Sequence, residues 1–270
     1  METIIAWIII SVGLAGGIFG PILTRKKTKL VAWYVVGWVG WFFFATVSSM
    51  FVLAFINLII DEKTLSGTTI TTVIDALMYL TMFGFMIWLP WRRWKTGEKG
   101  KSLKKGATRK FILKISGLDR RPTLDDVKKF ASFFPLYFVT NLAVSIVLAL
   151  LVSKEIMEQE QNVGFSTTGN TPLSLILIFL CLVVLAPLFE EMLIRGVLFS
   201  KLREKLKFWP VALLTASIFA LIHGQFNVGV MTFILALYAA FLREKTGAIW
   251  SGMMLHMMQN LIAFVVLFLT

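Results

Sequence analysis

Long, nearly uninterrupted apolar runs divide this chain, and they limit its fold more than any other feature of the sequence. A helix of about 20 apolar residues crosses a bilayer core, because in lipid each backbone N–H and C=O must be bonded within its own segment. The runs predict an all-α, polytopic membrane protein with about eight transmembrane helices. The expected helices cover residues 3–24, 30–60, 69–91, 130–153, 173–200, 209–223, 228–242 and 246–269.

Charge orients these helices in the membrane. The chain has 27 Lys and Arg against 15 Asp and Glu, a net charge of +12 that could indicate a nucleic-acid partner. The basic residues, however, gather in alternate loops between apolar runs, which is the pattern of the positive-inside rule. We therefore expect no nucleic acid, a multi-pass protein of the cell membrane, residues 92–129 in the cytoplasm and residues 154–172 outside. The single cysteine, Cys181, excludes an intrachain disulfide and is interpreted as packing.

Two parts are expected along the chain. Residues 1–129 hold three helices and a basic cytoplasmic segment, and residues 130–270 form the membrane domain that carries the polar motifs. The first run lacks a basic leader and a clear cleavage site, so it is expected to be retained as a helix. The basic segment is interpreted as a topology signal with a short amphipathic helix, and contact with anionic lipid or an acidic partner is the alternative.

Charged residues interrupt the run 173–200 at "PLFEEMLIRGVLF". Glu191 and Arg195 are four residues apart, lie on one helix face and can pair. Glu190 points about 100° away from them and is left without a counter-ion on its own helix. Because an ionisable side chain inside a membrane is costly, it is by default a candidate functional group. Asp75, near the outer end of its run, is instead expected to be wetted there.

Two further motifs place polar side chains at similar depth. "FALIH" sets Phe219 and His223 four apart, and "HMMQN" does the same with His256 and Asn260. At a rise of 1.5 Å per residue, Glu190 and His256 lie roughly 15 Å above the cytoplasmic edge and His223 roughly 20 Å. The runs 209–223 and 228–242 are too short to cross the core, so their joining turn should end inside the membrane. Together these features predict a polar, water-containing intramembrane pocket.

The chemistry of these groups favours hydrolysis of an amide. A carboxylate in an apolar pocket suits general-base work, and a neighbouring histidine can hold a water against it. Donors on His256 and Asn260 could stabilise a negative oxygen, and no serine or cysteine accompanies them as a nucleophile. No cofactor is expected. A zinc site made by Glu190, His223 and His256 remains the alternative, although no H-E-x-x-H motif is present.

In order and spacing, "EEMLIR", "FALIH" and "HMMQN" resemble the motifs of the CPBP family, the CAAX protease and bacteriocin-processing (Abi) membrane proteins. The resemblance covers about residues 130–265 and implies intramembrane proteolysis by a glutamate-activated water. It implies that Glu190 is the base, that His223 places the water, and that His256 and Asn260 form the oxyanion hole. By the same resemblance, three further residues would support the site: Glu191, Arg195 and Phe219.

The resemblance also suggests partners. The eight-helix, single-domain layout is similar to that of bacterial members, which are tied to bacteriocin maturation, self-immunity and regulation of membrane proteins. The expected partners are membrane lipids, a membrane-associated peptide or protein substrate, and a regulatory membrane partner. The alternative function is that of a non-enzymatic membrane scaffold for bacteriocin immunity or sensor-kinase regulation.

Overall fold

The computed structural model describes residues 107–153 and 171–269, together with single positions between 35 and 84. Within these ranges every regular element is helical and no strand occurs, which confirms the all-α class. Several expectations fall outside the described residues: the runs 3–24, 30–60 and 69–91, Asp75, and almost all of the outer loop 154–172. The total of eight helices therefore stays a prediction.

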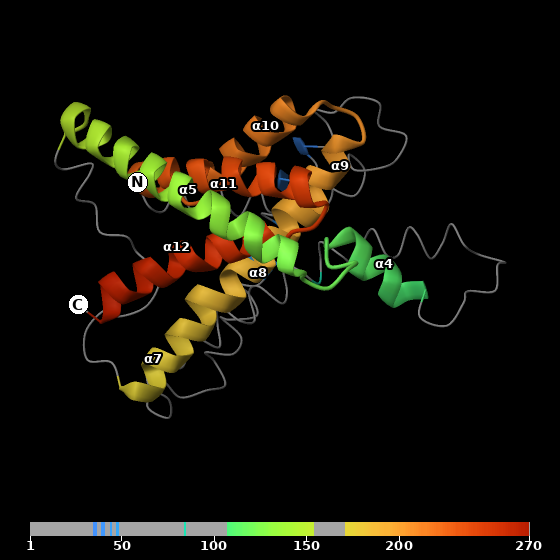
Figure 1. Ribbon diagram of the computed structural model, residues 1–270, viewed down its shortest axis with the longest axis horizontal. Coiled ribbons are helices and arrows are strands. Elements are labelled where there is room, and N and C mark those ends of the chain that lie inside the picture. The colour runs from blue at the N-terminus through green and yellow to red at the C-terminus, as the bar shows by residue number, and fades with distance from the viewer. Residues whose placement is uncertain are drawn as a thin grey trace. The chain divides into compact units, whose positions relative to one another are not determined.

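Within the described ranges, five segments of helix follow helix α4, Ala107–Ile115. They are α5 Leu124–Leu151, one continuous helix Pro172–Arg203, α10 Phe208–Leu221, α11 Phe226–Thr246 and α12 Trp250–Phe268. All except α10 are long and apolar enough to cross a membrane. Figure 1 shows their order along the chain. A multi-pass membrane protein is the class that these helices define.

The continuous helix changes its winding along its length. It is composed of α7 Pro172–Phe179, the π-helix η1 Leu180–Leu185, α8 Ala186–Glu191, the π-helix η2 Met192–Phe199, and α9 Ser200–Arg203. A π-turn closes on the fifth residue instead of the fourth and occurs frequently at functional sites. Both expected glutamates lie in α8, between the two π-helices.

The chain forms two compact units, residues 1–112 with 170–181, and residues 113–169 with 182–270. All seven expected site residues belong to the second unit. Within it, α11 packs against α5, α10 and α12, and α12 packs against α5 and α8. Helix α10 also contacts η2. Figure 1 shows α5 lying across α11 and α12.

Helix α11 is longer than the run 228–242 suggested, and that expectation was wrong. It has 21 residues, enough to cross a membrane, because its charged end continues the helix. Arg243 donates to the carbonyl of Gly247, and Arg203 forms an ion pair with Glu244 at 2.6 Å. The helix stops at Gly247, whose φ of 71° is left-handed and favours glycine. Helix α10, with 14 residues, is as short as expected.

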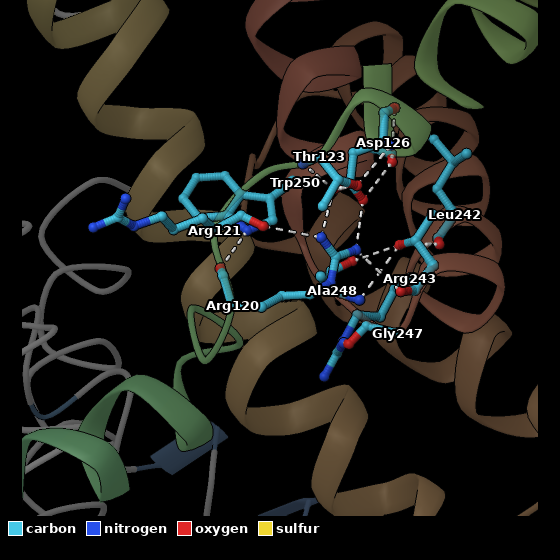
Figure 2. Close-up of polar contacts among 11 residues, drawn as sticks. Arg120, Arg121, Thr123, Asp126, Leu242, Arg243, Gly247, Ala248 and Trp250 are labelled. Carbon is cyan, nitrogen blue, oxygen red and sulfur yellow. Dashed lines mark hydrogen bonds and ion pairs between the residues drawn. The ribbon is translucent and has the colours of Figure 1, made fainter. Parts of the chain in front are cut away.

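A polar cluster fixes the start of α5 (Figure 2). Thr123 and Asp126 form a reciprocal capping box, which starts the helix at residue 124 and not at the expected 130. Arg120 holds both oxygens of the Asp126 carboxylate, at 2.5 and 2.7 Å, and its Nη2 also donates to the carbonyl of Thr246. The hydrogen bonds to Asp126 raise the pKa of Arg120. The indole of Trp250 donates to the carbonyl of Arg120.

The chain before α5 also touches the continuous helix closely. A Cβ on Gly196 would lie 2.3 Å from the carbonyl oxygen of Ser116, so only glycine fits there. Ser116 is itself buried. Residues 116–126 are therefore held between η2 and the turn that joins α11 to α12.

Candidate active site

A buried ion pair lies at the centre of the candidate site. Glu191 Oε1 is 2.9 Å from Arg195 Nη1, and both side chains are almost fully excluded from solvent. The four-residue spacing thus joins them across one turn, as the sequence predicted. None of the guanidinium nitrogens has a well-aligned hydrogen-bond acceptor within the described part of the chain. The attraction between these two groups is therefore chiefly electrostatic.

His256 of α12 lies between the two glutamates. Its Nδ1 is 3.3 Å from Glu191 Oε1, the same oxygen that faces Arg195, and its Nε2 is 3.6 Å from Glu190 Oε2. Glu190 is the accessible member, with a side chain 20% exposed against 3% for His256. Glu190 therefore has a partner on another helix, His256. Of the two adjacent carboxylates, that of Glu191 is buried and that of Glu190 is accessible.

Phe219 of α10 packs in the middle of these groups. Its ring centroid is 4.8 Å from that of His223 and 5.7 Å from that of His256, both in edge-to-face geometry. The guanidinium carbon of Arg195 lies 4.9 Å from the same centroid, within range of a cation–π contact. One fully buried ring thus spaces the two histidines and the arginine.

His223 follows the end of α10, in the turn that Gly224 completes with a φ of 71°. Its Nδ1 lies 2.7 Å from the carbonyl oxygen of Phe219. A carbonyl oxygen only accepts, so Nδ1 carries the proton in this bond and Nε2 keeps a lone pair when the ring is neutral. His223 thereby satisfies a carbonyl at the helix end and keeps one nitrogen able to accept from a water.

Asn260 occupies a separate position. Its Nδ2 donates to the carbonyl of Leu182 in η1 at 2.8 Å. In a π-helix that carbonyl would pair with the N–H of residue 187, which is Pro187 and has none. The amide of Asn260 supplies the missing donor, and one of its two Nδ2 hydrogens is used in doing so.

The structure thus brings six expected site residues into one connected cluster: Glu190, Glu191, Arg195, Phe219, His223 and His256. Asn260 lies one turn beyond His256 on α12, with a main-chain partner. Sequence analysis missed two pairs that attach α5 to α12, Tyr137 with Gln259 and Asp126 with Ser251. The Thr123–Asp126 spacing was a readable capping signal, whereas nothing in the sequence singles out Tyr137.

Within residues 107–153 and 171–269 no group of three or more His, Cys, Asp or Glu side chains is arranged to hold a metal ion. The contacts that the described site shows are hydrogen bonds, ion pairs and ring contacts.

The fold and the site define a helical membrane protein with a buried glutamate–histidine cluster. Comparison with known proteins shows which of these it resembles. Residues 172–262 match the family model described as type II CAAX prenyl endopeptidase Rce1-like. A Bacillus subtilis (strain 168) protein named "Putative membrane peptidase YdiL" is 29% identical over 77 residues, 28% of this chain and 32% of that protein. The match thus spans about a third of the relative. No solved structure matches the chain.

These matches confirm the resemblance to the CPBP family that the three motifs indicated. The segment matched by the family model contains all seven candidate residues, from Glu190 to Asn260. Over this segment the chain is thus similar to CAAX-protease-like membrane endopeptidases.

Proposed function

We propose that this protein is an intramembrane endopeptidase that hydrolyses a peptide bond in a membrane-associated protein or peptide, using a water activated by Glu190. The observation that carries the proposal is the division between the two adjacent glutamates. Glu191 is committed to Arg195 and fully buried, while Glu190 is partly accessible and lies 3.6 Å from His256. A base must reach its substrate water, and only the second carboxylate meets that condition.

The reaction would run without a covalent enzyme intermediate. Glu190 takes a proton from a water as the water oxygen attacks the peptide carbonyl carbon, and the Nε2 lone pair of His223 helps to hold that water. Donors on His256 and Asn260 stabilise the resulting oxyanion. The protonated Glu190 then gives its proton to the leaving nitrogen as the C–N bond breaks.

The other three residues would hold this machinery in place. Glu191 and Arg195 orient His256 through the shared Oε1, and Phe219 sets the spacing of the two histidines. We further propose that the site opens into a polar, water-holding pocket inside the catalytic domain 130–270 of an eight-helix protein. The short helix α10, which ends at the turn bearing His223, supports such a pocket because its 14 residues fall short of a bilayer core.

Membrane peptides from cells that produce the wild type or Glu190→Gln should reveal the activity. We expect peptide fragments that depend on the wild type and disappear in Glu190→Gln. The matched control is Glu204→Gln, which makes the same change directly after the end of the helix that carries Glu190, at the exposed Glu204–Lys201 pair. Equal peptide patterns for wild type and Glu190→Gln, at equal protein levels, would establish the scaffold function instead.

Asn260→Ala tests the oxyanion role and separates it from metal hydrolysis. Removal of one such donor typically lowers kcat about 100- to 1,000-fold. The amide is a poor zinc ligand, so a zinc enzyme should tolerate this change better. Elemental analysis and a chelator titration on one active preparation complete the test, and zinc at one ion per chain that tracks activity would contradict the water-activation mechanism.

A further inference from the structure

Helix α5 is attached to its unit in an unusual way. Most of its apolar side chains are exposed, as expected of a helix that faces lipid. Of its 28 residues only Asp126 and Tyr137 are buried, and both are polar. Both side chains also bond to the same neighbour, helix α12, which carries His256 and Asn260.

The first of these contacts lies at the N-terminal end of α12. Ser251 donates its hydroxyl to the main-chain carbonyl of Asp126 at 3.0 Å, and it also lies 3.4 Å from the Asp126 carboxylate. Arg120 neutralises that carboxylate, and Figure 2 shows it between Asp126 and the turn at Gly247 and Ala248. This contact fixes where α12 begins relative to α5.

The second contact lies about 12 Å further along α12, eight residues beyond Ser251 at 1.5 Å per residue. The hydroxyl of Tyr137 donates to Gln259 Oε1 at 2.9 Å. Tyr137 is 1% exposed, so water does not readily replace this bond. A bond at this height restricts rotation of α12 about its own axis.

His256 lies between the two contacts, five residues after Ser251 and three before Gln259. On a helix of 3.6 residues per turn, position 260 lies about 40° to one side of position 256 and position 259 about 60° to the other side. The same helix thus turns Gln259 toward α5 and His256 toward Glu190 and Glu191. Any rotation that breaks the Tyr137 bond also moves the His256 ring relative to the carboxylates.

We propose that Tyr137 is a positioning residue: through Gln259 it sets the rotation of α12 and thereby the placement of His256 and Asn260. The proposal rests on the proposed peptidase function for its kinetic consequence. Its structural consequence, a more mobile α12 when the Tyr137–Gln259 bond is lost, is independent of that function. A misplacement of about 1 Å far from the chemistry can cost about 100-fold in rate.

The chain offers a matched control. Tyr238 of α11 stacks edge-to-face on Tyr137 with centroids 5.5 Å apart, and its hydroxyl bonds to Thr140 at 2.8 Å. Thr140 already donates to the carbonyl of Leu136, so Tyr238 donates in this pair. Tyr238→Phe therefore removes the same atom from a neighbouring, partly buried ring that also bonds to α5, but it leaves the bond to α12 untouched.

The experiment compares Tyr137→Phe with Tyr238→Phe in purified protein. Kinetics use a fluorogenic peptide built on a cleaved sequence found in the membrane-peptide comparison. We expect Tyr137→Phe to lower kcat about 10- to 100-fold with KM nearly unchanged. Tyr238→Phe should stay within about twofold of wild type. Adding Gln259→Met to Tyr137→Phe should lower kcat no further, because the two residues act as one unit.

Hydrogen exchange measured by mass spectrometry separates this proposal from the proposed function. The amides of residues 250–262 should exchange faster in Tyr137→Phe than in Tyr238→Phe, whether or not the wild type cleaves a peptide. If the wild type is inactive, the peptidase function fails and this comparison still decides the positioning role. Equal exchange in both variants, equal kcat losses, or a further loss in the double variant would overturn the proposal.

Discussion

Removal of the buried arginine is the sharpest stability test of the site. In Arg195→Met a side chain of similar length fills the space, but Glu191 loses the guanidinium 2.9 Å away. Coulomb attraction at that distance is about 6 kcal/mol at an effective dielectric constant of 20. Much of it offsets the cost of burying the charges, and loss of one partner from a buried pair typically costs about 3–5 kcal/mol.

The remaining neighbours of Glu191 indicate how much of the free energy of unfolding Arg195→Met should lose within that range. His256 stays 3.3 Å from the same carboxylate oxygen and can still partner it, so we expect the lower end, about 3 kcal/mol. For a folded unit of 150–250 residues, 1 kcal/mol shifts Tm by about 2–4 °C, so Arg195→Met should lower Tm by about 6–12 °C. Tryptophan fluorescence during thermal unfolding in detergent measures it.

The double variant Glu191→Gln/Arg195→Met distinguishes an ion-pair effect from a packing effect. It removes both charges and keeps an amide that can bond to His256, so it should regain most of the lost Tm. The electrostatic account is wrong if the double variant has the same Tm as Arg195→Met. It is also wrong if the Tm of Arg195→Met lies within about 1 °C of the wild-type Tm.

Two further predictions concern packing and orientation. Gly196→Ala should prevent accumulation of folded protein, because its Cβ would lie 2.3 Å from the rigid backbone carbonyl of Ser116. Gly252→Ala, whose Cβ would lie 3.2–3.3 Å from the Cβ, Cα and carbonyl oxygen of Ala239, requires a much smaller shift and should lower Tm without preventing folding; a similar yield of both variants would contradict this. Cysteines placed at Ser102 and Ser166, in a chain with Cys181 replaced, should react with an impermeant thiol reagent from opposite sides of the membrane. Reaction of both from outside intact cells would refute the predicted orientation.

The sequence predicted the parts of this protein that depend on local spacing. Apolar runs gave the helices, and the four-residue intervals paired Glu191 with Arg195 and stacked Phe219 on His223. The end of α11 was misplaced because Arg243 and Glu244 were taken as loop charges. Each of them finds a partner that keeps it in the helix, Gly247 for the first and Arg203 for the second.

Contacts between distant helices were beyond the reach of the sequence. Glu190 meets His256 across 66 positions of the chain, and Tyr137 meets Gln259 across 122. Such contacts depend on how whole helices pack, and no local pattern encodes that packing. The bond from Asn260 to Leu182 was hidden for a related reason, since it depends on a π-helix that hydrophobic periodicity does not reveal.

The π-helix η2 has a consequence for how this sequence can vary. A π-turn contains one more residue than an α-turn, and one residue corresponds to about 100° of helix rotation. Deletion of a single residue between Met192 and Phe199 would let the segment rewind as an ordinary α-helix and would turn everything after it to another face. Gly196 would then leave the Ser116 carbonyl, and a bulkier neighbour would face it. The number of residues in η2 thus sets the direction in which the following residues face. Conservative substitutions should therefore be better tolerated here than a deletion or an insertion.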